Sequence, residues 1–151
     1  MRIPGWAKTA SILLLILVGG TVLWWQMQQD QALLRIGGER FHITVMRTEQ
    51  QLKDGLSGTD NLPNDEAMVF VFQEDSKWPM WMKDMKYPID ILWLNSGKQV
   101  VHIVKNAQPA SYPKTEFIPD SPSRYVIELA SGTADRTGVK IGDPVGLPSG
   151  I

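Results

Sequence analysis

The strongest pattern in the chain is an uncharged apolar run close to its start. No residue from Thr9 to Trp25 carries a charge, and the stretch from Ile12 to Val18 is continuously aliphatic. An α-helix needs roughly 20 residues to cross the hydrocarbon core of a bilayer. Each central Leu, Ile or Val favours insertion by roughly 0.3 to 0.6 kcal/mol. We therefore expect residues 9–25 to form a single transmembrane anchor.

The residues that flank this run predict its orientation. Arg2 and Lys8 precede it, whereas the five residues that follow it carry no positive charge. Positive charge stays on the cytoplasmic side of a membrane helix, and aromatic rings such as Trp24 and Trp25 gather at its interfaces. The N-terminus is therefore expected in the cytoplasm, with the tryptophans at the outer surface.

The rest of the chain then lies on the extracellular or periplasmic side. We expect a cytoplasmic segment over residues 1–8, a polar connector over 26–38 and one extracytoplasmic domain over 39–151. The alternative is a cleaved signal peptide, because its first two regions would look the same. The stretch Val18–Gly20 is a poor cleavage site, which favours an uncleaved signal-anchor.

Beyond the connector, the pattern changes to short segments rich in β-branched and aromatic residues. Phe41, Ile43 and Val45 alternate with His42, Thr44 and Met46, as in a half-buried strand. Similar segments predict further strands: Met68–Phe72, Trp78–Lys83, Ile89–Leu94, Gln99–Lys105, Tyr125–Leu129 and a last one within 139–145. The turn-forming sequence between 94 and 99 predicts that two of these strands form a hairpin.

Only two short helices interrupt this series. Thr48 and Gln51 have the spacing of a capping box, and Gly55 would end the helix. A second helix is expected over Thr133–Thr137, ending at Gly138. Many short strands with Gly and Pro turns predict an all-β domain, built as an antiparallel sandwich or barrel.

Composition excludes several functions. The chain has no cysteine, which excludes thiolate catalysis, iron–sulfur clusters and Cys-ligated zinc. Without Arg2, Lys8 and Asp30, the 15 basic and 16 acidic residues of the chain become 13 and 15. No basic stripe is present, so we expect no nucleic-acid partner. His42 and His102 are too few for a metal site, and we expect neither a metal nor another cofactor.

The ordered segments resemble the family called domain of unknown function 192. The resemblance covers about Phe41 to the end of the chain, and Trp-Met-Lys followed by Pro-x-Asp is its most specific part. The residues that carry it are Gly55-Leu56, Met68–Phe72, Trp81-Met82-Lys83, Pro88–Ile91, Tyr125–Leu129 with Gly132, and 138–145. It implies a jelly-roll-like β-sandwich in proteins that are often exported or membrane-tethered, and it implies no assigned activity. Thr59 and Met80 depart from the family pattern, which often has Arg and an aromatic residue there.

Four residues form the candidate ligand site. Asp90 begins an interior strand whose two faces are both apolar, so its carboxylate needs a cation or backbone N–H groups, and Lys83 is the nearest cation. Trp81 shares a face with Lys83 and offers an aromatic platform. Glu128 interrupts another apolar strand. The alternative is that these charges form a network that only specifies the fold.

Three functions remain open. The first is an envelope module that binds a small-molecule or glycan ligand through Trp81, Lys83, Asp90 and Glu128. The second is a hydrolase in which Asp90 and Glu128 act as acid and base, although no nucleophile motif favours an enzyme. The third is a protein-interaction domain with an apolar patch near Tyr112 and Phe117. The sequence does not set the oligomeric state.

Overall fold

The computed structural model describes residues 33–151, and the predicted anchor over 9–25 lies outside the described residues. None of the helices within 33–151 has both the length and the apolar character to span a bilayer. In chain order, the elements are β1 (Leu33–Ile36), β2 (Glu39–Met46), α2 (Glu49–Asp54), β3 (Glu66–Ser76), β4 (Ile89–Leu94), β5 (Val100–Ala107), the 3-10 turn η1 (Pro109–Ser111), β6 (Ser123–Ala130) and α3 (Thr133–Thr137).

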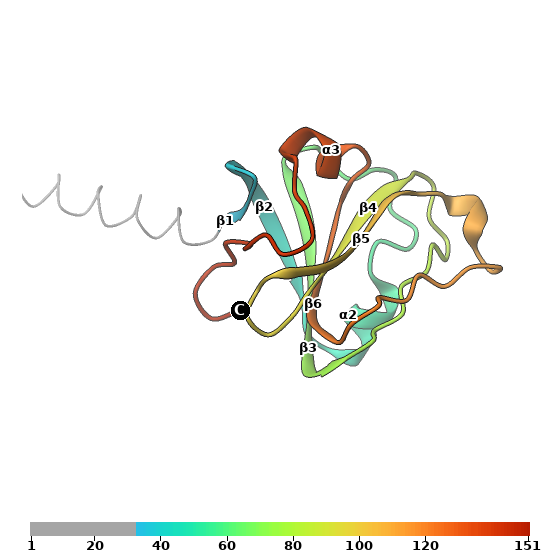
Figure 1. Ribbon diagram of the computed structural model, residues 1–151. Helices are drawn as coiled ribbons and strands as arrows, with labels where there is room; N and C mark the ends of the chain where they lie inside the picture. Colours follow the sequence, from blue (N-terminus) through green and yellow to red (C-terminus); the bar gives the residue numbers. More distant parts are fainter. Residues whose placement is uncertain (1–32) are drawn as a thin grey trace, which may run out of the picture. The chain divides into compact units, whose positions relative to one another are not determined.

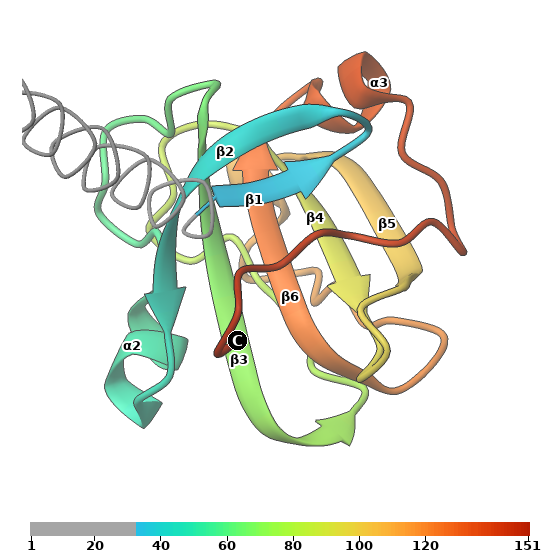
Figure 2. The same ribbon diagram turned by 90° about the vertical axis from the view of Figure 1, so that its left-hand side faces the viewer.

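The strands form one six-stranded sheet in the order β1-β2-β3-β6-β4-β5. Figures 1 and 2 show that this sheet is strongly curved. The all-β prediction is confirmed, as is the hairpin of β4 and β5. The two-layered antiparallel sandwich is wrong, because the strands share a single sheet and β2 pairs with β3 in parallel. The 19 residues from 47 to 65, which include α2, return the chain to the starting end of β2, as a parallel pair requires.

Strand β1 corrects the predicted domain boundary. Leu33–Ile36 pairs with β2 through the tight turn Gly37-Gly38, and Leu34 and Ile36 are buried in the core. The β domain therefore includes Leu33–Ile36, which lie within the segment expected to be a connector. Four residues are too few to show an alternating pattern, although the Gly-Gly pair is a hairpin signal that sequence reasoning passed over.

Each face of the sheet carries a buried apolar cluster. The first apolar cluster, on the concave face, combines Leu34, Phe41, Leu92 and Leu129 with residues of the C-terminal segment such as Val145. The second cluster, on the other face, includes Phe70, Met82, Trp93 and Val126. All six residues of β4 are buried as a result.

The C-terminal segment crosses the concave face and joins the two edges of the sheet, as Figure 2 shows. Gly146 pairs with Arg35 of β1 through two backbone hydrogen bonds of 2.9 and 3.0 Å. The N–H of Val100, at the start of β5, donates to Asp143. In place of the predicted last strand, the segment therefore forms isolated bridges. These bridges cover the two sheet edges, which an open sheet would leave unpaired.

The predicted strand over Trp78–Lys83 is wrong. This segment is irregular and pairs with the rest of the domain only at Met80, opposite Phe117. Pro79 lacks an N–H group and cannot donate to a ladder. Met80 and Met82 are nevertheless buried while Lys83 is exposed, so the expected alternation persists without a sheet partner.

Candidate functional site

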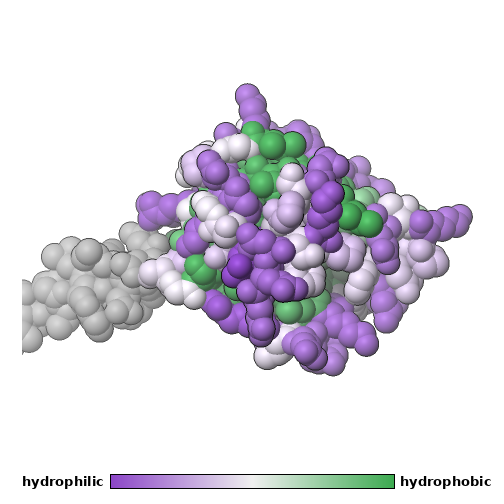
Figure 3. Space-filling view, turned by 60° about the horizontal axis from the view of Figure 1, so that its bottom comes forward, coloured by the Kyte–Doolittle hydropathy of each residue, from purple (hydrophilic) through white to green (hydrophobic). Residues whose placement is uncertain are grey.

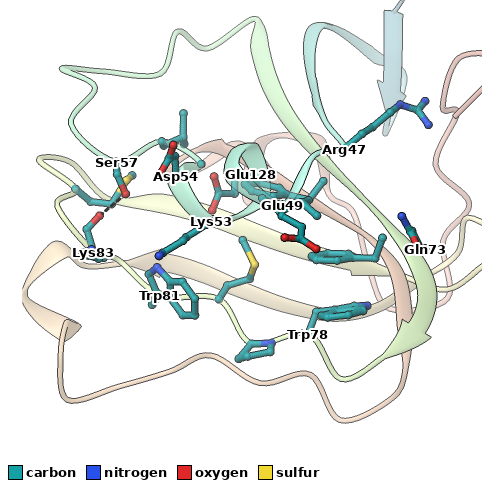
Figure 4. Close-up of a pocket in the computed structure, with 18 residues that line it drawn as sticks. Arg47, Glu49, Lys53, Asp54, Ser57, Gln73, Trp78, Trp81, Lys83 and Glu128 are labelled. Carbon is teal, nitrogen blue, oxygen red and sulfur yellow. Dashed lines mark hydrogen bonds between the residues drawn. The ribbon is translucent and has the colours of Figure 1, made fainter.

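A pocket of about 530 Å³ lies against the second apolar cluster. Figure 4 shows its lining residues arriving from α2, from the segment over residues 78–85 and from the sheet. This volume falls within the range of roughly 300–1,000 Å³ that is typical of small-ligand sites. Three of the four predicted site residues, Trp81, Lys83 and Glu128, line it.

Helix α2 forms one wall of the pocket, and its sequence fixes both of its ends. Gln51 N–H donates to the Thr48 hydroxyl at 3.3 Å, and the Gln51 side chain accepts from Thr48 N–H at 3.1 Å, which is the predicted capping box. Gly55 ends the helix at a φ of 48°. A Cβ atom at Gly55 would lie 3.2 Å from the Phe70 ring. The helix end therefore sits directly on β3.

The segment over residues 78–85 forms the facing wall and is held at several points. The indole N–H of Trp93 donates to the Trp78 carbonyl at 2.9 Å, which ties the segment to β4. The Trp78 ring stacks on Phe72 with a centroid separation of 4.2 Å and an angle of 8°. Met80 exchanges backbone hydrogen bonds of 2.9 and 2.8 Å with Phe117. An irregular backbone is thereby kept in a defined position.

Two further hydrogen bonds connect the walls to each other. The Ser57 hydroxyl, just beyond α2, donates to the Lys83 carbonyl at 2.9 Å. Gly58 N–H donates to the Asp84 carbonyl at 3.0 Å. The pocket is therefore built by contacts among its own wall segments, which supports a preformed site.

Glu128 reaches the pocket from the middle of the sheet. It stands in β6 between Met68 of β3 and Ile91 of β4, which are its cross-strand neighbours. The residue is only 4% exposed, and its Oε2 atom has no hydrogen-bond partner in the described part of the chain. Burial raises the pKa of the Glu128 carboxyl to about 8, because the charged form loses its hydration. The group is therefore mainly protonated at neutral pH.

Asp90 does not join this site. Its cross-strand neighbour on β6 is Leu129, which belongs to the concave face, whereas Glu128 faces the opposite side. The Asp90 carboxylate accepts hydrogen bonds from Asn106 N–H and Ala134 N–H, each at 2.8 Å. The expectation that it meets backbone N–H groups is confirmed, and its expected pairing with Lys83 is wrong. Asp90 holds the end of β5 and the start of α3 to the sheet.

Sequence reasoning missed several pocket residues. Lys53 on α2 lines the pocket, as do Phe72 and Trp78. The capping box predicted helix α2, but it did not predict that this helix forms a wall of the pocket. Tyr87 lies close to the site, and its hydroxyl is 2.6 Å from the Thr59 hydroxyl. Burial raises the pKa of Tyr87, and the negative charge of Glu128 contributes in the same direction.

The apolar patch expected near Tyr112 and Phe117 is only partly at the surface. Tyr112 is 42% exposed and Ile118 is 53% exposed, whereas Phe117 packs against the second apolar cluster. On the face shown in Figure 3, hydrophobic residues reach the surface in separate patches between hydrophilic ones. This distribution gives an interaction surface less support than the pocket gives a ligand site.

Two solved structures share this fold. A protein of unknown function from Novosphingobium aromaticivorans DSM 12444 is 28% identical, with a TM-score of 0.70, over 75% of this chain and 82% of that chain. A "putative transcription regulator" from Sinorhizobium meliloti 1021 is 28% identical, with a TM-score of 0.68, over 75% of this chain and 88% of that chain. No curated protein matches the sequence significantly.

The sequence model of one protein family covers most of the described domain. The model is that of DUF192, described as Uncharacterized ACR, and it matches residues 32–147. Its match includes every strand of the sheet and the whole pocket. The chain therefore belongs to the DUF192 family.

Proposed function

We propose that this protein is a membrane-anchored envelope module that binds a small ligand in the pocket beside Glu128. Residues 9–25 supply the anchor, and the β domain lies on the extracellular or periplasmic side. The pocket has the volume of a ligand site and walls that are tied together. The observation that carries the proposal is the Glu128 carboxyl, which is buried in the pocket wall with an oxygen that has no partner among residues 33–151.

An unpartnered buried oxygen needs an explanation in a well-packed domain. Leaving a buried polar atom without a hydrogen bond costs about 1–3 kcal/mol, and buried polar groups are almost always satisfied. Apolar residues at position 128 would continue the pattern of Val126 and Ala130 without this cost. A ligand that hydrogen-bonds the carboxyl supplies the missing interaction.

The other lining residues indicate the shape of the ligand. Phe70, Phe72, Trp78 and Trp81 present aromatic rings, and Met80 and Met85 add flexible apolar surface. Flat apolar bodies pack well against such walls, and so does the apolar face of a sugar ring. We therefore propose a ring-shaped ligand with at least one polar group directed at Glu128.

The geometry gives the hydrolase alternative no support. Asp90 and Glu128 project from opposite faces of the sheet, and both hydrogen-bonded oxygens of Asp90 serve backbone N–H groups. An acid and a base must flank the same scissile bond. This pair cannot do so, and we retain ligand binding as the function.

Ligand binding can be tested by thermal unfolding of the full-length chain in lipid nanodiscs, screened against aromatic compounds and methyl glycosides. A ligand that binds only the folded state raises the unfolding temperature. We expect any such shift to shrink in Trp81→Ala, which removes a lining ring, and to persist in Tyr112→Ala, which removes an exposed ring outside the pocket. Shifts that are equal in both variants would overturn the proposal.

The anchor has a separate test. An alkaline phosphatase domain fused after residue 151 is active only outside the cytoplasm, so we expect activity in the membrane fraction. Replacing Leu14 and Leu15 with Arg should release the fusion from the membrane, because each charge at the helix centre costs roughly 2.5–3.5 kcal/mol. An inactive, soluble fusion of the unaltered chain would contradict the proposed location.

A further inference from the structure

We infer that the inner end of the pocket takes the ammonium group of an organic cation, which forms an ion pair with Glu128. This inference rests on the proposed ligand-binding function and names the chemical class of the ligand. It starts from the position of the Glu128 carboxyl, which is 4% exposed and lines the pocket. The group therefore faces the ligand while it is shielded from water.

Among residues 33–151, no cation or other donor satisfies the Oε2 atom of Glu128. Its cross-strand neighbours are Met68 and Ile91, and burial raises the pKa of its carboxyl group to about 8. A nearby Lys or Arg would lower this pKa by favouring the carboxylate. The protein thus supplies the anion and its apolar shell, and it leaves the positive partner to the ligand.

The remaining charged groups of the pocket lie on exposed residues of its mouth. From α2 and its flanks come Arg47, Glu49, Lys53 and Asp54, and the facing wall adds Lys83. Arg47 donates to the Gly150 carbonyl at 2.8 Å and Asp54 accepts from Gln50 at 2.7 Å. At physiological salt, the electrostatic effect of exposed charges decays over about 8 Å. These mouth residues therefore exert only a weak field at the inner end of the pocket.

Tyr87 is a further titratable group near Glu128. It shares a 2.6 Å hydrogen bond with Thr59, and its pKa is raised, first of all by burial. The phenol is therefore neutral through the physiological range and adds no competing charge. Asp60 influences Tyr87 but is paired with Lys86 at 2.6 Å.

Aromatic walls favour the same ligand class. Phe70, Trp78 and Trp81 line the pocket, and an ammonium group placed over such rings is stabilised by cation–π attraction. An anion would lose this contribution and would meet a carboxyl group at the inner end. A neutral ligand would satisfy Glu128 by hydrogen bonding alone.

Binding of an ammonium ion must displace a proton. Below pH 8 the Glu128 carboxyl holds its proton, and the ion pair forms when the proton leaves to solvent and the carboxylate remains. Affinity then follows the ionised fraction of Glu128. It rises roughly thirtyfold between pH 5.5 and 7.0, with about one proton released per ligand at pH 7.

Two sources of the ammonium group fit these walls, and matched probes separate them. An arylalkylamine is represented by phenethylammonium, with phenylethanol and phenylacetate as its neutral and anionic counterparts. An amino sugar is represented by glucosamine, with glucose as its neutral counterpart. Isothermal titration calorimetry of the full-length chain in nanodiscs measures affinity, and buffers of different ionisation enthalpy measure proton release.

We expect one cationic probe to bind at least tenfold more tightly than its counterparts, with proton release and the stated pH dependence. Glu128→Gln should abolish the preference and the proton release, whereas Glu116→Gln, which removes an exposed carboxylate outside the pocket lining, should keep both. Tighter binding of phenylethanol, phenylacetate or glucose would overturn the inference while it leaves ligand binding intact. Binding that is unaffected by Trp81→Ala would overturn the proposed function as well.

Discussion

Asp90 and Glu128 stand on adjacent strands, one residue apart in the pairing register, and their side chains emerge on opposite faces of the sheet. The first carboxylate is buried and satisfied by two backbone N–H groups. The second is buried with an oxygen that has no partner among the described residues. A buried carboxyl group is therefore satisfied by the fold at one position, and we propose that a ligand satisfies it at the other.

Asp90→Asn should destabilise the domain without a specific effect on the pocket. The variant replaces charge-assisted hydrogen bonds to Asn106 and Ala134 with weaker ones and forces an amide N–H₂ group against a backbone donor. We expect a loss of about 2–4 kcal/mol in the free energy of unfolding. Urea unfolding measures it, and Asp135→Asn, at an exposed site, is the control. A loss below about 0.5 kcal/mol would contradict the structural role.

Glu128 should make the domain less stable as the pH rises. Burial raises the pKa of Glu128 to about 8 in the folded state, whereas the unfolded chain releases this proton near the ordinary pKa of 4.5. Between these values the folded state binds more protons, so each pH unit removes up to about 1.4 kcal/mol of stability. Urea unfolding at pH 5, 6, 7 and 8 should show this slope.

Two variants isolate the contribution of Glu128 to this slope. Glu128→Gln removes the titrating group and should flatten the profile between pH 5 and 8. Glu116→Gln alters an exposed carboxylate and should leave the profile as in the unaltered chain. Parallel profiles for all three proteins would show that Glu128 is ionised in the folded state.

The two glycines of the first turn should differ in their tolerance of alanine. Both have positive φ, 55° at Gly37 and 86° at Gly38, so alanine costs roughly 1–2 kcal/mol at either position. A Cβ atom at Gly37 would also overlap the Thr137 carbonyl oxygen, whereas nothing lies within 4 Å of one at Gly38. We expect Gly37→Ala to lower the unfolding free energy clearly more than Gly38→Ala. Equal losses of unfolding free energy in the two variants would contradict the close contact between Gly37 and Thr137 of α3.

Leu34→Ala should reveal that the domain includes the strand before this turn. Leu34 is fully buried, and removing such a side chain costs about 2–5 kcal/mol through lost burial and the cavity left behind. Leu33→Ala, at the partly buried neighbouring position, is the matched control and should cost less. Chemical unfolding of both variants checks this. If Leu34→Ala left the free energy of unfolding unchanged, residues 33–36 would belong to the connector and not to the folded domain.

Local sequence signals predicted the local parts of the fold. The capping box at Thr48, the hairpin turn after Leu94 and the helix over Thr133–Thr137 each depend on residues within a few positions of one another. Alternation likewise predicted the face of Glu128 within its own strand. These features follow from backbone geometry and short-range hydrogen bonds, which a single sequence contains.

The relation between distant segments could not be predicted in this way. The position of Asp90 relative to Glu128 depends on the register between β4 and β6. Tertiary packing sets this register, so a single sequence does not reveal it. The segment from Trp78 to Lys83 has the composition of a strand, but its backbone is held by the Trp93 indole N–H, the Ser57 hydroxyl and a single bridge to Phe117. The pocket arises from this irregular wall, and composition alone cannot distinguish such a wall from a strand.

The backbone bonds between Arg35 and Gly146 also govern when the domain can fold. They join positions 111 apart (146 − 35), and the same segment reaches Val100 at the far edge. During synthesis, β1 and β5 emerge long before their common partner, and contacts of such sequence separation form slowly. Until residue 146 has been synthesised, the C-terminal segment cannot cover the two sheet edges, and unpaired edges of this kind are sites where other strands can pair.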